Sequence, residues 1–286
     1  MNAKAKTTAS SNHLPRSGGI LKHTVQVQTL QGITKQKYTI FTTEDRIRII
    51  PVGDIHIGAP QGQCQLKKVA ALLEHIEKTP NTYMLGTGDY MDCAQKMPGK
   101  KGPSVYFQSM PPQQQLEKIQ MMLLRLAQKH KILGLHGGNH EGWILELTGI
   151  DVIKILADNL KVPYLGPACD TTVDLVNRAG QKQRYLIYSQ HGNSNAKQKH
   201  TKMGALIAAT KDIFAHIFIW GHVHQVGSER GGKRFNGNQI KCYYVLAGHW
   251  LDWEGSYAQL FGLDICPAGT AKIQLFADRN DVHVVV

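Results

Sequence analysis

RIRIIPVGDIHIG, residues 46–58, runs from an apolar, β-branched segment into a glycine, a carboxylate and an imidazole. Residues 46–52 have the composition of a buried β-strand. Asp54 and His56 follow this run two positions apart, so both side chains can point to one side of the emerging strand end. A carboxylate and an imidazole in that arrangement offer two ligands to a divalent metal ion. The stretch therefore predicts a strand whose carboxyl end carries metal ligands.

Three further motifs of the same kind follow in order, and one isolated histidine lies between them. The motifs are GDYMD (88–92), GNHE (138–141) and GHVH (221–224), and the histidine follows the strand-like run YLIYSQ at 185–190. As metal ligands these segments offer Asp54, His56, Asp89, Asn139, His191, His222 and His224. Carboxylate oxygen, amide oxygen and imidazole nitrogen together suit divalent ions. The sequence predicts ligands that are scattered along the chain and gathered by the fold.

Each motif alone has an ordinary structural explanation. A His-x-His pair arises easily by chance in a chain with 14 histidines among 286 residues, and Gly-Asp is most often a turn. The joint order is harder to explain by chance, because every motif stands where a strand ends and a loop or helix begins. A metal site is therefore favoured over a series of unrelated turns.

Strand-like and helix-like runs alternate through most of the chain. In order, the sequence predicts a helix at 66–76, a strand at 82–86, a helix at 115–130, a strand at 131–136, one helix at 143–160, and strands at 185–190, 216–220, 243–248, 271–277 and 281–286. The last strands have no helices between them. This order predicts an α/β fold, a four-layer α/β/β/α sandwich of two mixed β-sheets flanked by helices.

The first 44 residues differ from the rest in composition. Residues 1–19 are polar and contain no acid, which predicts a disordered basic arm. Residues 20–44 alternate around Gln31 and Gly32, which is typical of a β-hairpin-like extension. The catalytic domain is therefore expected at 45–286.

The ordered motifs resemble the signature of the calcineurin-like metallophosphoesterase superfamily. That signature reads D-x-H, GDxxD, GNH[ED], a histidine beside a glycine, and GHxH. Here the matching residues are Asp54 with His56, Asp89 with Asp92, Asn139 to Glu141, His191 with Gly192, and His222 with His224. The resemblance covers Gly53 to His224 and implies the same four-layer sandwich.

The resemblance also implies two metal sites that share one ligand. It assigns one ion to Asp54, His56, Asp89 and His224, and a second ion to Asp89, Asn139, His191 and His222. Asp89 is the implied bridge. The expected cofactors are two divalent ions, with Mn²⁺ as the first choice and Fe, Zn, Ni or Co as alternatives.

Two paired ions imply a metal-dependent hydrolase that acts on phosphoesters. Ions about 3.5 to 4 Å apart lower the pKa of a shared water and neutralise charge on the phosphoryl oxygens, so a metal-bridged hydroxide is the expected nucleophile. The leaving group still needs a proton. His140 follows Asn139 directly, and the resemblance assigns this histidine the role of the acid. Asp92 is expected to hold the His140 ring in its useful tautomer, with a turn cap as its alternative role.

Composition agrees with a soluble enzyme. The chain has 286 residues of which 42% are hydrophobic, enough for one large core, and it has no run of about 18 apolar residues that could cross a membrane. Its five cysteines form no CxxC pair, and the first residues lack the apolar segment of a secretory signal. A cytoplasmic location is therefore expected.

Charge gives the clue to substrate. The formal net charge is +12, and one acid-free basic stretch flanks His191 between Asp174 and Asp212. The basic residues expected to bind substrate are Lys96, Lys100, Lys101, Arg184, Lys197 and Lys199. A basic field attracts polyanions, so the favoured substrate is a phosphodiester in nucleic acid or a nucleotide. A solvated basic surface that only aids solubility is the alternative.

Two other functions stay open. One is a phosphomonoesterase acting on a small phosphoester or a phosphoprotein, although Cys93 and Ala94 stand where protein Ser/Thr phosphatases carry Arg-Gly. The other is a nucleic-acid-binding module with a structural metal site. It is disfavoured because structural sites usually close their coordination shell with Cys and His, whereas these ligands leave room for water.

Overall fold

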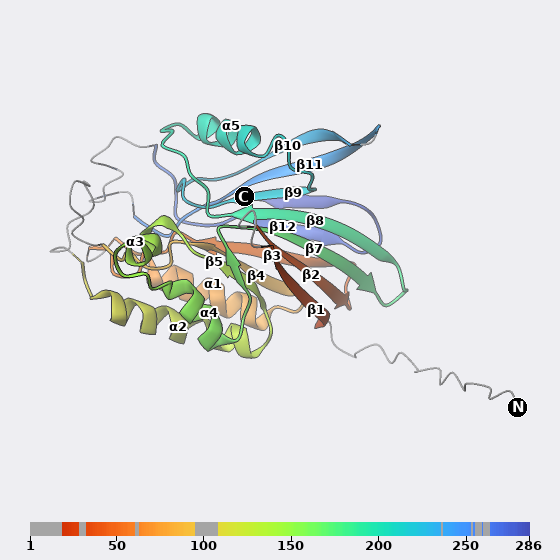
Figure 1. Ribbon diagram of the computed structural model, residues 1–286. Coiled ribbons are helices and arrows are strands. Elements are labelled where there is room, and N and C mark those ends of the chain that lie inside the picture. Colours follow the sequence, from red (N-terminus) through yellow and green to blue (C-terminus); the bar gives the residue numbers. More distant parts are fainter. Residues whose placement is uncertain are drawn as a thin grey trace, which may run out of the picture.

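Two β-sheets pack face to face, and helices cover both outer faces (Figure 1). This arrangement comes from a computed structural model that describes residues 19–28, 33–60, 63–94, 108–235, 237–252, 254, 259 and 264–286. The predicted basic arm lies outside the described residues except for Gly19. No helix in these ranges is both long enough and apolar enough to cross a membrane.

The first sheet has seven strands in the order β1-β2-β7-β8-β9-β11-β10. Their bounds are Gly19–Gln28 (β1), Ile33–Thr42 (β2), Ala168–Asn177 (β7), Lys182–Gln190 (β8), Ile217–Trp220 (β9), Asn238–Ala247 (β11) and Val226–Phe235 (β10). β1 and β2 pair antiparallel, and β2 continues the sheet by pairing parallel with β7. The sheet is therefore mixed, and the first two strands form one edge of it.

The second sheet has six strands in the order β13-β12-β3-β4-β5-β6. Their bounds are Val282–Val285 (β13), Lys272–Phe276 (β12), Arg46–Gly53 (β3), Thr82–Gly88 (β4), Ile132–His136 (β5) and Tyr164–Gly166 (β6). The strands from β3 to β6 are parallel, so their carboxyl ends meet at one edge of the sheet. Since β12 and β13 are antiparallel, this sheet is mixed as well.

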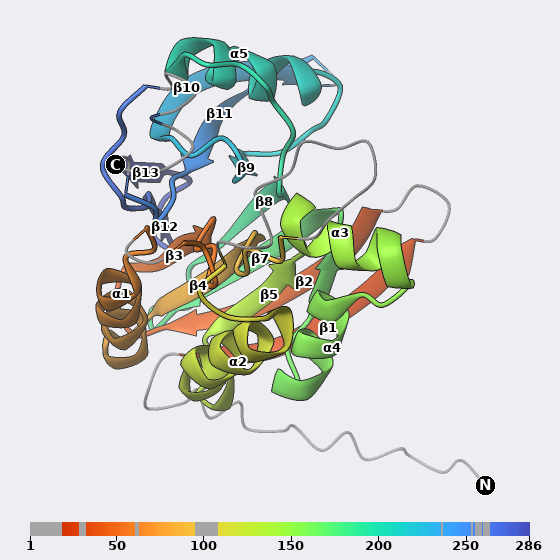
Figure 2. The same ribbon diagram turned by 90° about the vertical axis from the view of Figure 1, so that its left-hand side faces the viewer.

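Helices pack against the outer faces of both sheets through apolar stripes. On the six-stranded sheet these are α1 (Leu66–Lys78), α2 (Pro112–Gln128), α3 (Asn139–Thr148) and α4 (Val152–Leu160), and on the seven-stranded sheet α5 (Lys199–Ala209) (Figures 1 and 2). In α1 the buried residues Val69, Leu73 and Ile76 recur at helical spacing. A separate apolar layer, with Ile49, Leu85 and others, fills the space between the sheets. The predicted α/β/β/α sandwich is confirmed.

The single helix predicted at 143–160 is wrong, because the chain forms α3 and α4 there. Gly149 ends α3 in the left-handed conformation with φ 73°. The Asp151 carboxylate then starts α4 by accepting hydrogen bonds from the amides of Ile153 and Lys154. A left-handed glycine followed by an aspartate cap is a common way to end one helix and begin another.

Candidate metal centre

Five strand ends from both sheets deliver the predicted ligands to one place. Asp54 follows β3, Asp89 follows β4 and Asn139 opens α3 after β5, all on the six-stranded sheet. His191 follows β8 and His222 follows β9 on the seven-stranded sheet. The α3 end of the molecule, which carries this site, faces the viewer in Figure 2.

One glycine shows how closely the loops approach. A Cβ atom at Gly138 would overlap the carboxylate and the amide nitrogen of Asp89. Only a residue without a side chain therefore allows the loop after β5 to lie against the loop after β4. This close approach explains why a glycine precedes Asn139.

The first group of ligand atoms comes from Asp54, His56 and His224. His224 Nε2 lies 3.2 Å from Asp54 Oδ1 and 3.1 Å from His56 Nε2. Asp54 Oδ1 is buried and accepts no hydrogen bond from the described residues. A buried carboxylate oxygen beside two imidazole nitrogens that face each other is an arrangement that a cation would satisfy.

The second group comes from Asp89, His191 and His222, with Asn139 between them. His191 Nε2 lies 3.2 Å from Asp89 Oδ2 and 3.0 Å from Asn139 Oδ1. His222 Nδ1 lies 2.7 Å from the same Asn139 oxygen. The donor set is again oxygen and imidazole nitrogen, which fits a divalent ion.

Asp89 connects the two groups. Its Oδ2 atom is 3.2 Å from His191 Nε2 in one group and 3.9 Å from His56 Nε2 in the other. Its Oδ1 atom accepts a hydrogen bond of 2.9 Å from the His140 amide. The carboxylate is fixed by the protein and faces both groups, so it can serve two cations.

Five of the seven predicted ligand residues have a left-handed backbone. The φ angles are 49° at Asp54, 54° at His56, 52° at Asp89, 64° at His222 and 49° at His224. Each such non-glycine residue costs on the order of 1 kcal/mol or more and persists only where surrounding contacts enforce it. Strain of this kind, gathered at one place, indicates a functional site.

Burial and neighbouring charges shift the pKa values of two histidines of the site, His191 and His56. Burial lowers the pKa of His191, but the Asp89 carboxylate outweighs burial and raises this pKa to about 10. Burial, together with the neighbouring His140, holds the pKa of His56 well below its ordinary value. The Asp89 carboxylate therefore favours the protonated form of His191, whereas His56 is held neutral, the form in which an imidazole binds a metal ion.

His140 and Asp92 lie beside the first group. His140 Nδ1 donates to the main-chain carbonyl of Asp92 at 2.6 Å, while the Asp92 carboxylate is 3.7 Å away. The carbonyl therefore fixes the tautomer, and Nε2 is the nitrogen left for chemistry. The same carboxylate lies 3.9 Å from His56 Nδ1. Burial, opposed by His140, raises the pKa of Asp92 to about 6.

Glu141 holds the site together, although no role was predicted for this residue of the GNHE motif. It is 3% exposed and accepts three main-chain hydrogen bonds, from the amides of Asp89 (3.0 Å), Met91 (3.0 Å) and Gly138 (2.9 Å). These amides belong to the loops after β4 and β5. Glu141 therefore ties together the two loops that carry the bridging carboxylate and Asn139.

Two further residues support the GHVH loop and were not predicted. Lys202 of α5 is 3% exposed, and its Nζ donates to the carbonyl of Val223 at 2.8 Å, between the two ligand histidines. His249 stacks on His224 with ring centroids 5.3 Å apart. Both nitrogens of His249 already bond to the main chain of Leu251 and Cys266, which excludes it as a ligand.

The predicted substrate-binding residues fall into three groups. Lys96, Lys100 and Lys101 lie outside the described residues. Lys197 and Lys199 are exposed on the segment that leads from His191 into α5. The structure does not bring Arg184 to the site. It lies seven positions before His191 on β8, and its guanidinium binds the Asp174 carboxylate at 2.6 and 3.0 Å.

Comparison with solved structures finds similar folds at low sequence identity. Vacuolar Protein Sorting 29 from Cryptosporidium parvum is 14% identical with a TM-score of 0.41, and the match covers 85% of this chain and 98% of that one. The calcineurin-like phosphoesterase YfkN from Bacillus subtilis is 12% identical with a TM-score of 0.41, covering 84% and 90%.

No curated protein gives a significant match to this chain. The family comparison is positive. The model of the calcineurin-like phosphoesterase family matches residues 47–250, which include every predicted ligand from Asp54 to His224 and amount to more than half of the sequence. The chain therefore belongs to the calcineurin-like phosphoesterase family.

Proposed function

We propose that this protein is a dinuclear-metal phosphoesterase whose substrate is a phosphodiester in nucleic acid or a nucleotide. The observation that carries the proposal is the pair of ligand groups that share Asp89, whose Oδ2 faces a histidine of each group at 3.2 and 3.9 Å. Asp54, His56, Asp89 and His224 would hold one divalent ion. Asp89, Asn139, His191 and His222 would hold the other, with Mn²⁺ as the favoured metal.

The metal ions and the protein divide the chemistry between them. Two bound ions would activate water and neutralise charge on the phosphoryl oxygens. The protein orients the ligands through the Glu141 bonds to the loops after β4 and β5 and through the Lys202 bond to the GHVH loop. These hydrogen bonds join protein atoms only, so they can hold the loops in place for an incoming ion.

His140 is the proposed proton donor to the leaving oxygen. Its Nδ1–H is held by the Asp92 carbonyl at 2.6 Å, so Nε2 is the nitrogen that can carry a transferable proton. The Asp92 carboxylate lies 3.7 Å from the same ring nitrogen. A proton donor is useful because the departing alkoxide is a strong base.

Charge and loop composition support the choice of a diester. The net charge of +12 and the exposed Lys197 and Lys199 favour a polyanionic substrate. Cys93 is completely buried at the position where protein Ser/Thr phosphatases carry an arginine, so this chain has no such arginine to grip a phosphate. The five cysteines are all unpaired, which favours a reducing location such as the cytoplasm.

Hydrolysis of simple substrates tests the proposal. The protein is stripped with EDTA, reloaded with Mn²⁺, and assayed on an aryl phosphodiester and the matching aryl phosphomonoester. We expect diester hydrolysis that needs the metal and disappears in Asp89→Asn, with Asp158→Asn, an exposed acid of α4, as the control. Faster hydrolysis of the monoester would support a phosphomonoesterase, and nucleic-acid binding without any hydrolysis would support a structural metal site.

A further inference from the structure

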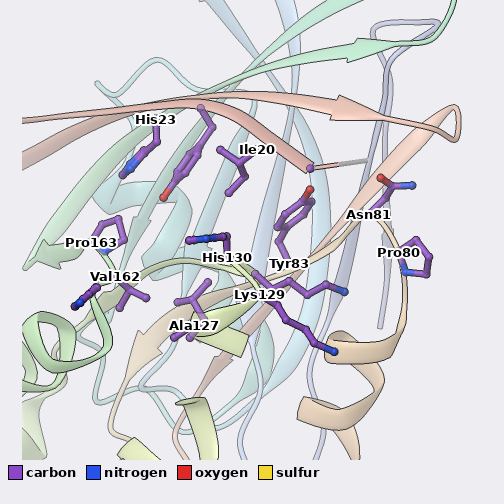
Figure 3. A pocket seen from close by; sticks show the side chains of 15 residues that line it. Ile20, His23, Pro80, Asn81, Tyr83, Ala127, Lys129, His130, Val162 and Pro163 are labelled. Carbon is purple, nitrogen blue, oxygen red and sulfur yellow. The ribbon is translucent and has the colours of Figure 1, made fainter. Parts of the chain in front are cut away.

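A cavity of 470 Å³ lies at the opposite end of the sheets from the metal centre. Its walls come from β1, β2, β4 and the three turns that follow α1, α2 and α4 (Figure 3). β4 begins beside the cavity at Thr82 and ends at Gly88, next to Asp89, so the two places are about 20 Å apart. The volume falls in the range of about 300–1,000 Å³ that is usual for small-molecule sites.

The three turns share an uncommon backbone conformation. Asn81, His130 and Lys161 have φ angles of 52°, 53° and 55°. Of the nine described non-glycine residues with positive φ, the other six lie in the metal-ligand loops. Glycine is the usual residue at such positions after a helix, because a side chain there is strained. Three polar side chains are therefore kept at this cavity at a cost in stability.

Two polar groups of the residues that line the cavity have no hydrogen-bond partner among the described residues. Asn81 is 4% exposed, and its Nδ2 donates to Thr43 Oγ1 at 3.3 Å, but its Oδ1 accepts no hydrogen bond from the described residues. The Tyr83 hydroxyl also has no hydrogen-bond partner among the residues that the structure describes. Figure 3 shows Asn81 at the right of the cavity, with Tyr83 between it and His130. A buried acceptor without a donor is costly unless a bound molecule supplies one.

The charge of the cavity favours an anion. No acid is among its lining residues, whereas Lys129, Lys131, Lys161 and His130 are. Lys129 Nζ is held by Glu77 at 2.8 Å, and Lys131 Nζ by two main-chain carbonyls at 2.6 Å each. The side chains of Lys161 and His130 have no hydrogen-bond or ion-pair partner among the described residues. Those two basic side chains are therefore available to a ligand.

The remaining wall is aromatic and apolar. The rings of His23 and Tyr38 stack with centroids 4.1 Å apart and planes 8° from parallel. Ile20 and Pro163 line the cavity near this stack, as does the ring of Tyr83 (Figure 3). Such a wall accommodates a flat ring better than a hydrated sugar or a bare phosphate.

We propose that this cavity binds a mononucleotide. The phosphate would lie at Lys161 and His130, and the nucleobase would lie against the Tyr83 side of the wall, next to Asn81, whose Oδ1 has no donor among the described residues. The site is separate from the metal centre and uses none of its residues. A mononucleotide fits better than inorganic phosphate because only the mononucleotide would contact both the basic side chains of Lys161 and His130 and the apolar wall.

Calorimetric titration of the full chain with AMP and UMP tests the proposal. The protein is first treated with EDTA, so that the result does not depend on the metal centre or on hydrolysis. We expect one site per chain with a Kd below about 1 mM, and at least about tenfold weaker binding of ribose 5-phosphate and of inorganic phosphate. No binding of either nucleotide at about 10 mM would overturn the proposal, and so would equal affinity for ribose 5-phosphate.

Two substitutions separate binding from folding. His130→Gly and Lys161→Gly each remove a side chain at a position where glycine relieves strain, so the unfolding temperature is expected to stay the same or to rise. Each variant should bind AMP about tenfold or more weakly, as expected for the loss of a side chain that contacts the phosphate. Lys154→Ala removes an exposed lysine of α4 that does not line the cavity, and it should bind like the unaltered protein. Unchanged affinity in both glycine variants would overturn the placement.

Discussion

His140 is the residue whose chemistry is most directly testable. Its side chain is 14% exposed, close to the first ligand group, and its Nδ1 is fixed by the Asp92 carbonyl. We predict that His140→Ala keeps both metal ions but loses about 10²-fold or more in turnover of substrates with poor leaving groups. Activated aryl esters should lose much less, because their leaving groups need no proton.

Steady-state kinetics on a series of aryl phosphodiesters of rising leaving-group pKa measures this difference. Elemental analysis of the same preparations shows whether the ions are retained. If good and poor leaving groups lose the same factor, the proton-donor role of His140 is wrong and the residue acts in binding instead.

Asp174 is a second residue with a measurable signature. It lies opposite Arg184 in the pairing of β7 with β8, and it also binds Lys37 at 3.0 Å. The Arg184 hydrogen bonds, with help from Lys37 against the effect of burial, lower the pKa of Asp174 to about 2. Its unfolded pKa is about 3.9. A lowered pKa adds stability that is complete above the unfolded value and is lost as the pH falls towards about 2.

Thermal unfolding of Asp174→Asn and of the unaltered protein at several pH values tests the predicted direction of this pH dependence. The unfolding temperature of the variant should be lower by a constant amount from pH 5 to pH 7, and the gap should shrink below about pH 4. A gap that stays constant down to pH 3 would mean that the carboxylate charge does not contribute.

At the scale of elements, the loops after β4 and β5 depend on one side chain from α3. We predict that Glu141→Gln lowers metal affinity by about 10- to 100-fold, because an amide nitrogen replaces one acceptor oxygen and leaves buried N–H groups unpaired. Hydrogen exchange gives a reading that needs neither metal nor substrate. The amides of Asp89, Met91 and Gly138 should exchange faster in the metal-free variant.

Glu146→Gln is the matched control, since Glu146 belongs to the same helix and is exposed. It should change neither the exchange of those three amides nor the metal affinity. Unchanged exchange in Glu141→Gln would show that the loops are held by packing of the backbone rather than by this carboxylate.

The break between α3 and α4 gives a paired test of backbone conformation. Gly149→Ala places a side chain at φ 73° and should lower the free energy of unfolding by about 1 kcal/mol. Gly142 lies inside α3 with nothing within 4 Å of an added Cβ, so Gly142→Ala should raise it by about 0.5–1 kcal/mol. Chemical denaturation measures both, and a loss of stability in Gly142→Ala together with a gain in Gly149→Ala would contradict the assignment.

Elements with strong apolar periodicity could be predicted from the sequence, and others could not. The strand at 46–52 and the helix at 66–76 have clear patterns and are present as β3 and α1. β10 (VGSERGGKRF) has charges and adjacent glycines instead of alternation, and it forms because all ten residues pair with β11. The short α5 depends on Met203 and Leu206 packing against the sheet, which is a tertiary effect.

The same distinction applies to the site. The seven predicted ligand residues could be named because their side-chain chemistry is visible in the motifs, and the structure brings them together. The roles of Glu141 and Lys202 could not, because both act on main-chain groups of other loops, and the sequence does not show which amide or carbonyl a side chain will meet. His249 was missed for a related reason, since its contact with His224 joins two distant loops.

At the scale of the whole molecule, part of the positive charge has a local structural use. Lys37, Lys182 and Arg184 gather around the single carboxylate of Asp174. Lys233 donates to the carbonyl of Ile213 and lies over the ring of Phe218. A count of basic residues in the sequence therefore overstates the charge that is free to meet a substrate.

Lys197 and Lys199 keep the substrate hypothesis testable. We predict that changing both to Gln weakens binding of single-stranded polynucleotide and lowers the slope of log K against log salt by about one unit for each lost phosphate contact. Binding titrations across a salt series on metal-loaded protein measure the slope. Turnover of a small aryl phosphodiester should be unchanged, and an unaltered slope would show that these two charges serve solubility.

The origin of the ligands in both sheets has a mechanical consequence. Each ion would be coordinated by side chains from the loops after β3, β4 or β5 of one sheet and from the loops after β8 or β9 of the other. Each ion would therefore cross-link the two sheets. Binding that needs both sheets in register adds to the free energy of unfolding, by about 2.7 kcal/mol when the free ion is at 100 times its Kd. A chelator would then lower the free energy of unfolding of the whole sandwich and not only the stability of the loops from which it removes the ions.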